Sequence, residues 1–177
     1  MDEKTISTLL KEGDFQNAFQ GIVSLYSEKL YWHVRRFTLC HEDADDLVQE
    51  VYIKIWKGLP SFMGESRIFT WIWRIATNEA LNYVSRAKLR STLSLSSYAS
   101  RADRIIDSDP WFDGDAAQRS LSKALARLPS RQRAVFCMRY YDDLSYEEIS
   151  EITGTSVGAL RASYHFAAEK VKDFIKE

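Results

Sequence analysis

The sequence predicts an all-α protein made of two small helical domains joined by a flexible linker. Only 3 prolines and 7 glycines interrupt its 177 residues, and the apolar residues recur at the three-and-four spacing of a helical face. Hydrophobic residues make up 45% of the chain, enough to build the cores of two small domains. The predicted domains span residues 1–90 and 119–177, with the linker at residues 91–118.

The first domain is expected to hold three long helical segments. One or two helices run over residues 15–39, and an amphipathic helix runs over residues 43–59 with Asp43 as its N-cap. Glycine and proline then break the pattern, so a loop at residues 60–66 precedes a helix over residues 67–87.

Residues 91–114 are rich in serine and acidic turn formers and show no helical stripe, which predicts a linker. The segment nevertheless carries more apolar residues than a spacer needs, namely Leu93, Leu95, Tyr98, Trp111 and Phe112. Two explanations remain open: part of the segment lies in a groove of a partner, or these side chains pack on the flanking domains.

The second domain is predicted to contain helices over residues 116–128 and 131–141, followed by a helix–turn–helix. Ser145 and Glu148 have the spacing of a capping box for a helix over residues 146–152. A turn through Thr153 and Gly154 leads to a last helix, capped by Thr155 or Ser156. In such an arrangement the second helix enters the DNA major groove.

Three outward helical faces are candidate binding sites. On the 43–59 helix, Asp46, Gln49, Ile53 and Trp56 point away from the core stripe, with Asp45 beside them, which suggests a docking patch for a partner. The alternative is that another element of the same domain covers Trp56.

On the 67–87 helix, Trp71, Arg74, Asn78 and Asn82 share a second face. Aromatic, cationic and amide groups together suit unpaired nucleic acid, because a ring stacks on an exposed base and an amide reads its edge. The alternative for Trp71 is an ordinary core position.

On the last helix, Ala159, Ala162, Ser163 and Phe166 lie opposite the apolar face, flanked by Arg161 and His165. Small residues allow the backbone to approach base edges, and Arg161 can reach guanine or a phosphate. The alternative is an antiparallel helix pair without a DNA role.

The segments that carry these faces resemble a bacterial RNA polymerase sigma factor of the extracytoplasmic function (ECF) group. They read DADDLVQEVYIKIW, FTWIWRIATNEALNY, LPSRQRAVF and LSYEEISEITGTSVGALRASYHFAAEKV, in the family's order. The resemblance implies a sigma region 2 helical bundle that binds the polymerase and melts the minus-ten element. It also implies a region 4 helix–turn–helix that reads the minus-35 element.

Combining the resemblance with the faces above gives two sets of site residues. The polymerase-binding set is Asp45, Asp46, Gln49, Glu50, Ile53 and Trp56. The DNA-binding set is Phe62, Trp71, Arg74, Asn78, Tyr146, Glu147, Ser156, Ala159, Arg161, Ala162, Ser163, His165 and Phe166. Ser163 and Phe166 depart from the family, whose members commonly carry basic residues there, and Ala162 often corresponds to a small polar residue.

The expected partners are core RNA polymerase, promoter DNA and, by the resemblance alone, an anti-sigma factor. The net charge of −1 predicts weak binding to free DNA. No apolar run approaches the ~18 residues of a membrane span, so we expect a cytoplasmic protein without membrane insertion. The alternatives are a stand-alone helix–turn–helix regulator that binds duplex DNA as a dimer and, with less support, an adaptor that does not bind DNA.

We expect no enzyme activity, cofactor or metal. The sequence contains neither GxGxxG nor GxxxxGK[ST]. His33, Cys40 and His41 lack a fourth ligand at a standard metal spacing. Asp45 and Asp46 are adjacent on a helix and diverge by about 100°, so they do not converge on one substrate atom.

Overall fold

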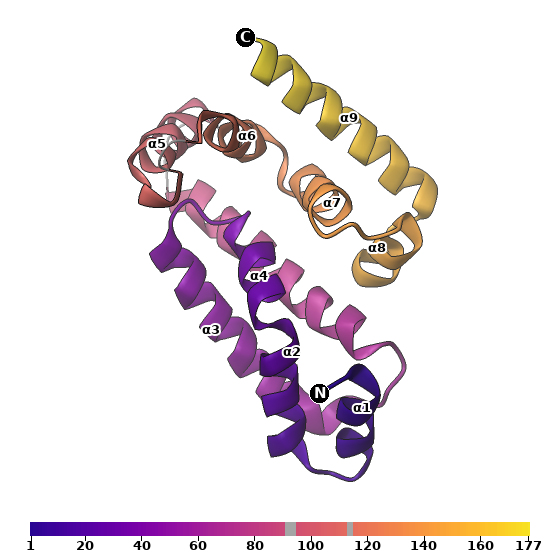
Figure 1. Ribbon diagram of the computed structural model, residues 1–177. Coiled ribbons are helices and arrows are strands. Elements are labelled where there is room, and N and C mark those ends of the chain that lie inside the picture. Colours follow the sequence, from indigo (N-terminus) through magenta and orange to yellow (C-terminus); the bar gives the residue numbers. More distant parts are fainter. Residues whose placement is uncertain (91–94, 113–114) are drawn as a thin grey trace.

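The computed structural model of the protein describes residues 1–90, 95–112 and 115–177, and the regular structure in these ranges is helical (Figure 1). The elements are α1 (Glu3–Lys11), α2 (Phe15–Arg35), α3 (His41–Gly58), η1 (Leu59–Ser61), α4 (Ile68–Arg90), α5 (Leu95–Ser108), η2 (Pro110–Phe112), α6 (Ala116–Arg127), α7 (Ser130–Tyr140), α8 (Tyr146–Thr153) and α9 (Val157–Lys176). The predicted all-α class is confirmed. We call α1–α4 the first half of the molecule and α6–α9 the second half.

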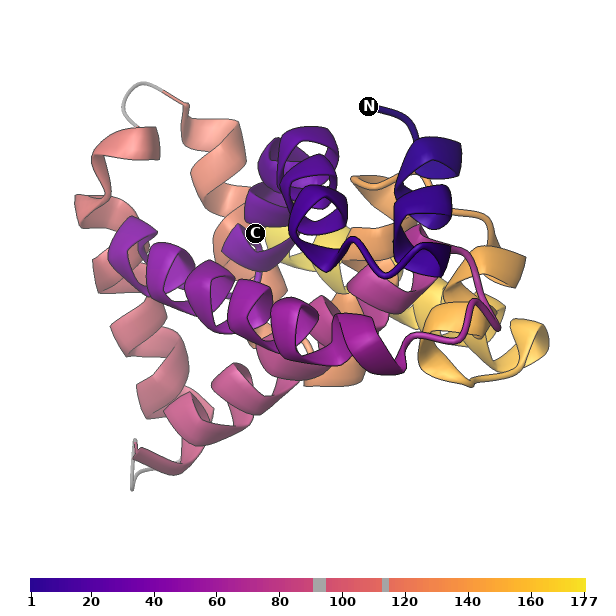
Figure 2. The ribbon, with the colours of Figure 1, turned by 90° about the horizontal axis from the view of Figure 1, so that it is seen from below.

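The first half is a bundle in which α2, α3 and α4 pack together and α1 lies against α2 (Figure 2). The stripe predicted on α3 is buried: Ala44, Val51 and Ile55 are fully inaccessible to solvent. Ile72 and Trp73 of α4 are buried against it. Burial of these side chains supplies most of the stabilisation of such helices, because tertiary packing of an amphipathic face contributes more than intrinsic helix propensity.

Two details of the first half differ from the sequence-based expectation. Helix α1 was not predicted, but Asp2 caps it by accepting the backbone N–H of Thr5, and Ile6 is completely buried. Helix α3 begins at His41, so Asp43 lies in the first turn and is not the N-cap. The carboxylate of Asp43 instead accepts a hydrogen bond of 2.6 Å from the Tyr83 hydroxyl, which joins α3 to α4.

The second half confirms the predicted helix–turn–helix. Ser145 and Glu148 form both hydrogen bonds of a capping box at the start of α8. Gly154 ends α8 with φ of +72°, a conformation that favours glycine. Ser156 is the residue that caps α9, accepting the backbone N–H of Ala159 at 3.3 Å.

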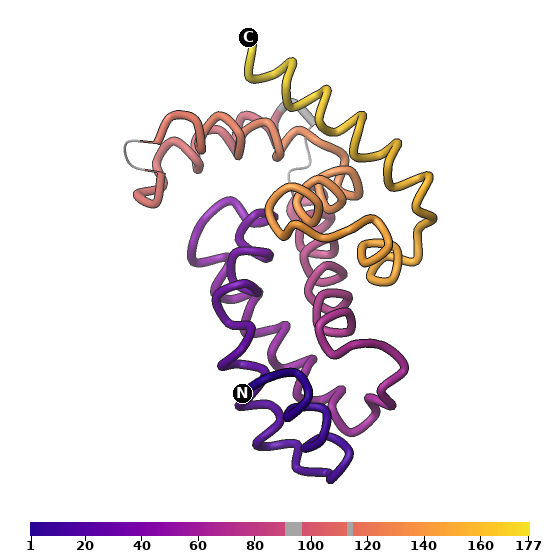
Figure 3. Tube along the Cα trace, turned by 45° about the vertical axis from the view of Figure 1, so that its right-hand side comes forward, coloured from indigo at the N-terminus to yellow at the C-terminus, as the bar shows by residue number. Residues whose placement is uncertain are grey.

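The inner face of α9 packs on the other helices of the second half. Leu160, Ala167 and Val171 are buried against α6, α7 and α8. Ile175 is half exposed because the last turns of α9 extend past the other helices (Figure 3).

The prediction that residues 91–114 lack a helix was wrong. Helix α5 packs against α6, and its Tyr98, Ala102 and Ile106 are buried together with Leu39 and Ala126. Serine lowers helix propensity only slightly, and the spacing of these apolar residues outweighs it. Of the apolar residues discussed for the linker, Leu93 lies outside the described residues and Tyr98 packs within the chain, whereas Trp111 is 58% exposed.

The two halves contact each other through α4, which packs against α7 and α8 (Figure 3). The Asp142 carboxylate, in the loop after α7, is the centre of this contact. It accepts hydrogen bonds from the Trp73 indole (3.2 Å) and Arg36 (2.7 Å), and the Nδ1 atom of His33 lies 2.7 Å from it. Thr77 lies 3.0 Å from the other ring nitrogen of His33.

Candidate functional site

The outer face of α3 carries the predicted polymerase-binding set. Asp45, Asp46, Gln49 and Glu50 lie on the surface side of the helix, and Ile53 is 53% exposed. Asp45 is 3.1 Å from His41, and Glu50 is 3.9 Å from Arg86 of α4. These contacts leave the acidic and amide groups on the surface, as the helical spacing predicted.

Trp56 is partly covered by its own domain and partly exposed as a candidate docking surface, so each of the two interpretations holds for one side of the ring. Phe19 of α2 packs edge-on against its ring, with ring centroids 5.4 Å apart, yet 47% of Trp56 remains accessible. One side of the indole is therefore covered by the same domain. The other side forms an apolar surface next to Ile53, bordered by the acidic and amide groups of α3.

Trp71 is held in a packed position at the end of α3. Its ring lies 5.0 Å from that of Phe62, and a Cβ placed at Gly58 would come within 2.7 Å of the indole. Glycine at position 58 therefore permits this close approach. The structure brings Trp71 and Phe62 together, but the tryptophan is partly buried and does not project as a free ring.

Arg74 and Asn78 follow Trp71 on α4 and are exposed, as predicted. The Arg74 guanidinium donates a 2.8 Å hydrogen bond to the backbone carbonyl of Glu151 in α8. This face of α4 therefore looks toward the second half of the molecule. In the arrangement seen here, one of its predicted DNA-binding groups is already occupied.

The outer face of α9 is open. Arg161, Ala162, His165 and Phe166 are exposed, and the exposed fraction of Phe166 is 57%. Ser156 and Ala159 are exposed at the start of the helix, and Ser163 is half-buried. The Phe166 ring lies 5.8 Å from the ring of its neighbour His165 and is otherwise open to solvent over more than half of its surface, so this face is suited to a ligand.

Tyr146 of α8 joins the α9 face. The Arg161 guanidinium lies 5.6 Å from its ring centroid and that of Arg139 lies 5.3 Å from it. Glu147 is exposed beside Tyr146 at the start of α8. The structure thus brings Tyr146 and Arg161, both predicted to bind DNA, next to each other.

The Asp142 contact was not found by sequence reasoning. Burial raises the pKa of Asp142, but the charges and hydrogen bonds of His33 and Arg36 outweigh burial, so the pKa lies below its usual value. The carboxylate is consequently a charged group that ties the two halves together. No local signal could have revealed it, because His33 and Asp142 are 109 positions apart in the sequence.

The residues considered for a metal site have other partners. His33 contacts Asp142 and Thr77, and His41 contacts Tyr31 and Asp45. Within the described ranges, no group of three or more metal-ligating side chains occurs. Burial raises the pKa of the Cys40 thiol to about 11, so this cysteine is largely protonated at neutral pH.

Across residues 1–90, 95–112 and 115–177, the helices lack the combination of length and apolar character that a bilayer span requires.

Comparisons with known proteins identify both halves. The family model described as Sigma-70 region 2 matches residues 22–90, and the model described as Sigma-70, region 4 matches residues 118–171. The ECF RNA polymerase sigma factor SigW of Bacillus subtilis is 28% identical over 177 residues, which cover 95% of this chain and 94% of SigW. The ECF RNA polymerase sigma-E factor of Haemophilus influenzae is 30% identical over 185 residues, which cover 99% of this chain and 96% of that protein.

Solved structures show the same fold. CnrH, solved in complex with the cytosolic domain of CnrY, has a TM-score of 0.72 at 19% identity, covering 98% of this chain and 97% of CnrH. The sigma factor RpoE of Bartonella quintana, solved with the anti-sigma factor NepR, has a TM-score of 0.67 at 23% identity, covering 89% and 96%. At these identities the structural likeness shows the fold alone. The two sigma-70 regions and the full-length match to the Haemophilus protein together show that the chain belongs to the ECF RNA polymerase sigma factors.

Proposed function

We propose that the outer face of α3 is the surface by which this sigma factor binds core RNA polymerase. Ile53 and Trp56 supply a half-exposed apolar centre, and Asp46 and Gln49 supply a polar border. A desolvated apolar centre with a polar rim is the usual composition of a protein–protein interface. A polymerase surface with basic and apolar side chains would complement it.

We infer that α9 reads the minus-35 element as duplex DNA. The observation that carries this assignment is the geometry of the helix–turn–helix, in which a capped α8 and the turn at Gly154 leave Arg161, Ala162 and Phe166 on the outer face of α9. The Arg161 guanidinium suits guanine or a phosphate, and Ala162 and Phe166 suit a thymine methyl group.

The outer face of α4 is proposed to contact the unwound minus-ten element. Arg74 and Asn78 supply a cation and an amide, and Trp71 with Phe62 supplies aromatic surface at the same end of the bundle. Because Arg74 is bound to the Glu151 carbonyl, this contact requires α8 to separate from α4. The proposed domains are residues 1–90 and 119–177, joined by residues 91–118, which include α5.

The chain directs promoter-specific transcription initiation as a sigma factor. We infer that it does so by binding rather than by catalysis, and that it works in the cytoplasm, where the polymerase transcribes. The neighbour RpoE was solved with an anti-sigma factor, and we propose a partner of that kind for this chain. The match to sigma factors over 99% of the chain leaves the stand-alone regulator without separate support.

The test is transcription in vitro with purified core polymerase and fragmented genomic DNA, followed by mapping of the transcript starts. We expect specific starts that need both the core enzyme and this chain, with a shared pair of upstream elements. A gel shift of the same promoters by the chain without polymerase, together with no specific starts in its presence, would instead support a stand-alone regulator.

A further inference from the structure

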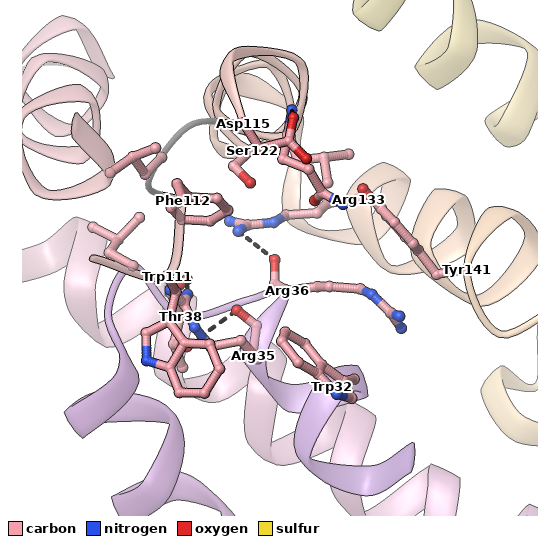
Figure 4. A pocket seen from close by; sticks show the side chains of 14 residues that line it. Trp32, Arg35, Arg36, Thr38, Trp111, Phe112, Asp115, Ser122, Arg133 and Tyr141 are labelled. Carbon is pink, nitrogen blue, oxygen red and sulfur yellow. Dashed lines mark hydrogen bonds between the residues drawn. The ribbon is translucent and has the colours of Figure 1, made fainter. Parts of the chain in front are cut away.

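Between the two halves lies a cavity of about 420 Å³ that the sigma-factor role does not use (Figure 4). One side is formed by the end of α2 with Trp32 and Arg36, and by η2 with Trp111 and Phe112. The other side is formed by α6 and by Arg133 of α7. Cavities of this size with aromatic walls and a few polar groups are typical of small-molecule sites.

Arg133 is the unusual residue in this cavity. Only 3% of it is exposed, and its guanidinium donates a hydrogen bond to the backbone carbonyl of Arg36. Its Nε atom has no hydrogen-bond partner, and no carboxylate of the described residues forms an ion pair with it. The centroid of the Phe37 ring lies 5.7 Å from the guanidinium carbon, but an aromatic ring does not neutralise the charge. A buried cation is costly unless an anion accompanies it, so this group calls for an anionic partner.

Among the residues that the structure describes, the other charges around the cavity do not supply that anion. Arg35 is paired with Asp109, and Arg36 is paired with Asp142. Asp115, at the rim, is exposed and accepts the backbone N–H of Gln118 as the cap of α6. The described lining of the cavity therefore carries an excess of positive charge at its buried end.

The aromatic walls suit a flat, apolar body. Trp32 and Trp111 meet edge to face with ring centroids 6.2 Å apart, and both are substantially exposed, at 40% and 58%. The Phe112 ring centroid lies 5.5 Å from the Arg35 guanidinium. A planar ring placed among these side chains would cover apolar surface that solvent now reaches, which favours binding.

We propose that this cavity binds a small aromatic anion, whose carboxylate or phosphate group pairs with Arg133 and whose ring packs among Trp32, Trp111 and Phe112. Because the walls come from both halves of the molecule, the bound anion stabilises the packed arrangement. A ligand that binds only this arrangement opposes separation of α8 from α4 by a free energy of RT ln(1 + [L]/Kd), where [L] is its free concentration.

The test is isothermal titration calorimetry of the full chain with phenyl phosphate and with benzoate, which distinguish a phosphate from a carboxylate. Inorganic phosphate and benzyl alcohol serve as probes that lack the ring or the charge. We expect at least one aromatic anion to bind about tenfold or more tightly than either of these, since both the ion pair and the ring contribute. Binding of neither aromatic anion, or equal binding of inorganic phosphate, would overturn the proposal.

Two pairs of variants localise the binding. Arg133→Met is expected to weaken it about tenfold or more, whereas Arg131→Met, at an arginine on the surface of the same helix, should leave it unchanged.

In case Arg133→Met does not fold, Gln118→Glu adds a negative charge at the cavity rim in the first turn of α6, where an acidic residue favours the helix. It should weaken anion binding severalfold, with Gln20→Glu on α2 as the charge-matched control. Binding that is unaffected by Gln118→Glu places the anion elsewhere.

Discussion

Replacing Asp142 with asparagine is expected to weaken the packing between the two halves, and its effect can be worked out from the contacts. The Asp142 side chain is 9% exposed and accepts bonds from Arg36 and Trp73, with His33 as a third neighbour. The side-chain amide introduced by Asp142→Asn would keep one acceptor oxygen but lose the charge. Loss of the charged bond to Arg36 costs about 1.5 to 3 kcal/mol and of one neutral bond about 1 kcal/mol, so we expect a loss of about 3 kcal/mol.

The neighbouring carboxylate provides the matched control. The Asp143 side chain is 98% exposed, and its ion pair with Arg139 spans 3.8 Å. Its φ of +53° is tolerated by asparagine, so Asp143→Asn does not strain the backbone. An exposed pair contributes little, and we expect this change to alter stability by less than about 0.5 kcal/mol.

The measurement is urea unfolding at pH 7, followed by both tryptophan fluorescence and circular dichroism. If Asp142→Asn and Asp143→Asn reduce the free energy of unfolding equally, or if Asp142→Asn costs less than about 1 kcal/mol, the reasoning about a buried charged contact is wrong. A separation of the two probes in the variant would show that the halves no longer unfold together.

Four further outcomes are expected. The pKa of Asp142 is held below its unfolded value of about 3.9, so its contribution to stability is present above that pH and is lost as the pH falls through the lower folded-state pKa. In acid, the wild type should therefore lose a part of its free energy of unfolding that Asp142→Asn does not lose. Asp46→Arg combined with Gln49→Ala should weaken binding to core polymerase in a pull-down while circular dichroism stays unchanged, and undiminished capture would count against the α3 surface. Trp71→Ala should reduce promoter opening, read by permanganate reactivity, more than it reduces closed-complex formation, and a wild-type footprint would remove this role. Arg161→Ala should cost ~1 to 3 kcal/mol in binding to the cognate minus-35 element, whereas an equal loss on every sequence would reduce Arg161 to a phosphate contact.

The features predicted from sequence were those set by neighbouring residues. The buried stripe of α3 follows from the spacing of Ala44, Leu47, Val51 and Ile55, and the start of α8 follows from the Ser145 capping box. Both depend on residues within a few turns of one another. The exposed residues of α3 were also placed correctly, because the outer face of a helix is fixed once its inner face is known. On α9 the same reasoning holds for Arg161, Ala162 and Phe166, whereas Ser163 is half-buried.

Features that depend on distant residues were missed. The Asp142 contact and the burial of Arg133 arise only when the two halves meet, and the sequence carries no periodic signal for either. Helix α5 was not predicted because its serines are typical of a linker, although Tyr98 and Ala102 have helical spacing. Trp71 and Arg74 were correctly assigned to one helical face, but their contacts within the chain were not predicted. The Trp71 ring packs on Phe62, and the Arg74 guanidinium is bonded to α8.

Helix α5 has a mechanical consequence for the distance that this sigma factor can span. Its 14 residues are about 21 Å long as a helix, whereas the same residues fully extended reach about 46 to 50 Å. Melting this one helix would therefore more than double the length of tether that it contributes. The distance between two DNA elements that the chain can bind at once therefore depends on whether α5 stays folded. Its Tyr98, Ala102 and Ile106 hold it by packing against Leu39 and Ala126.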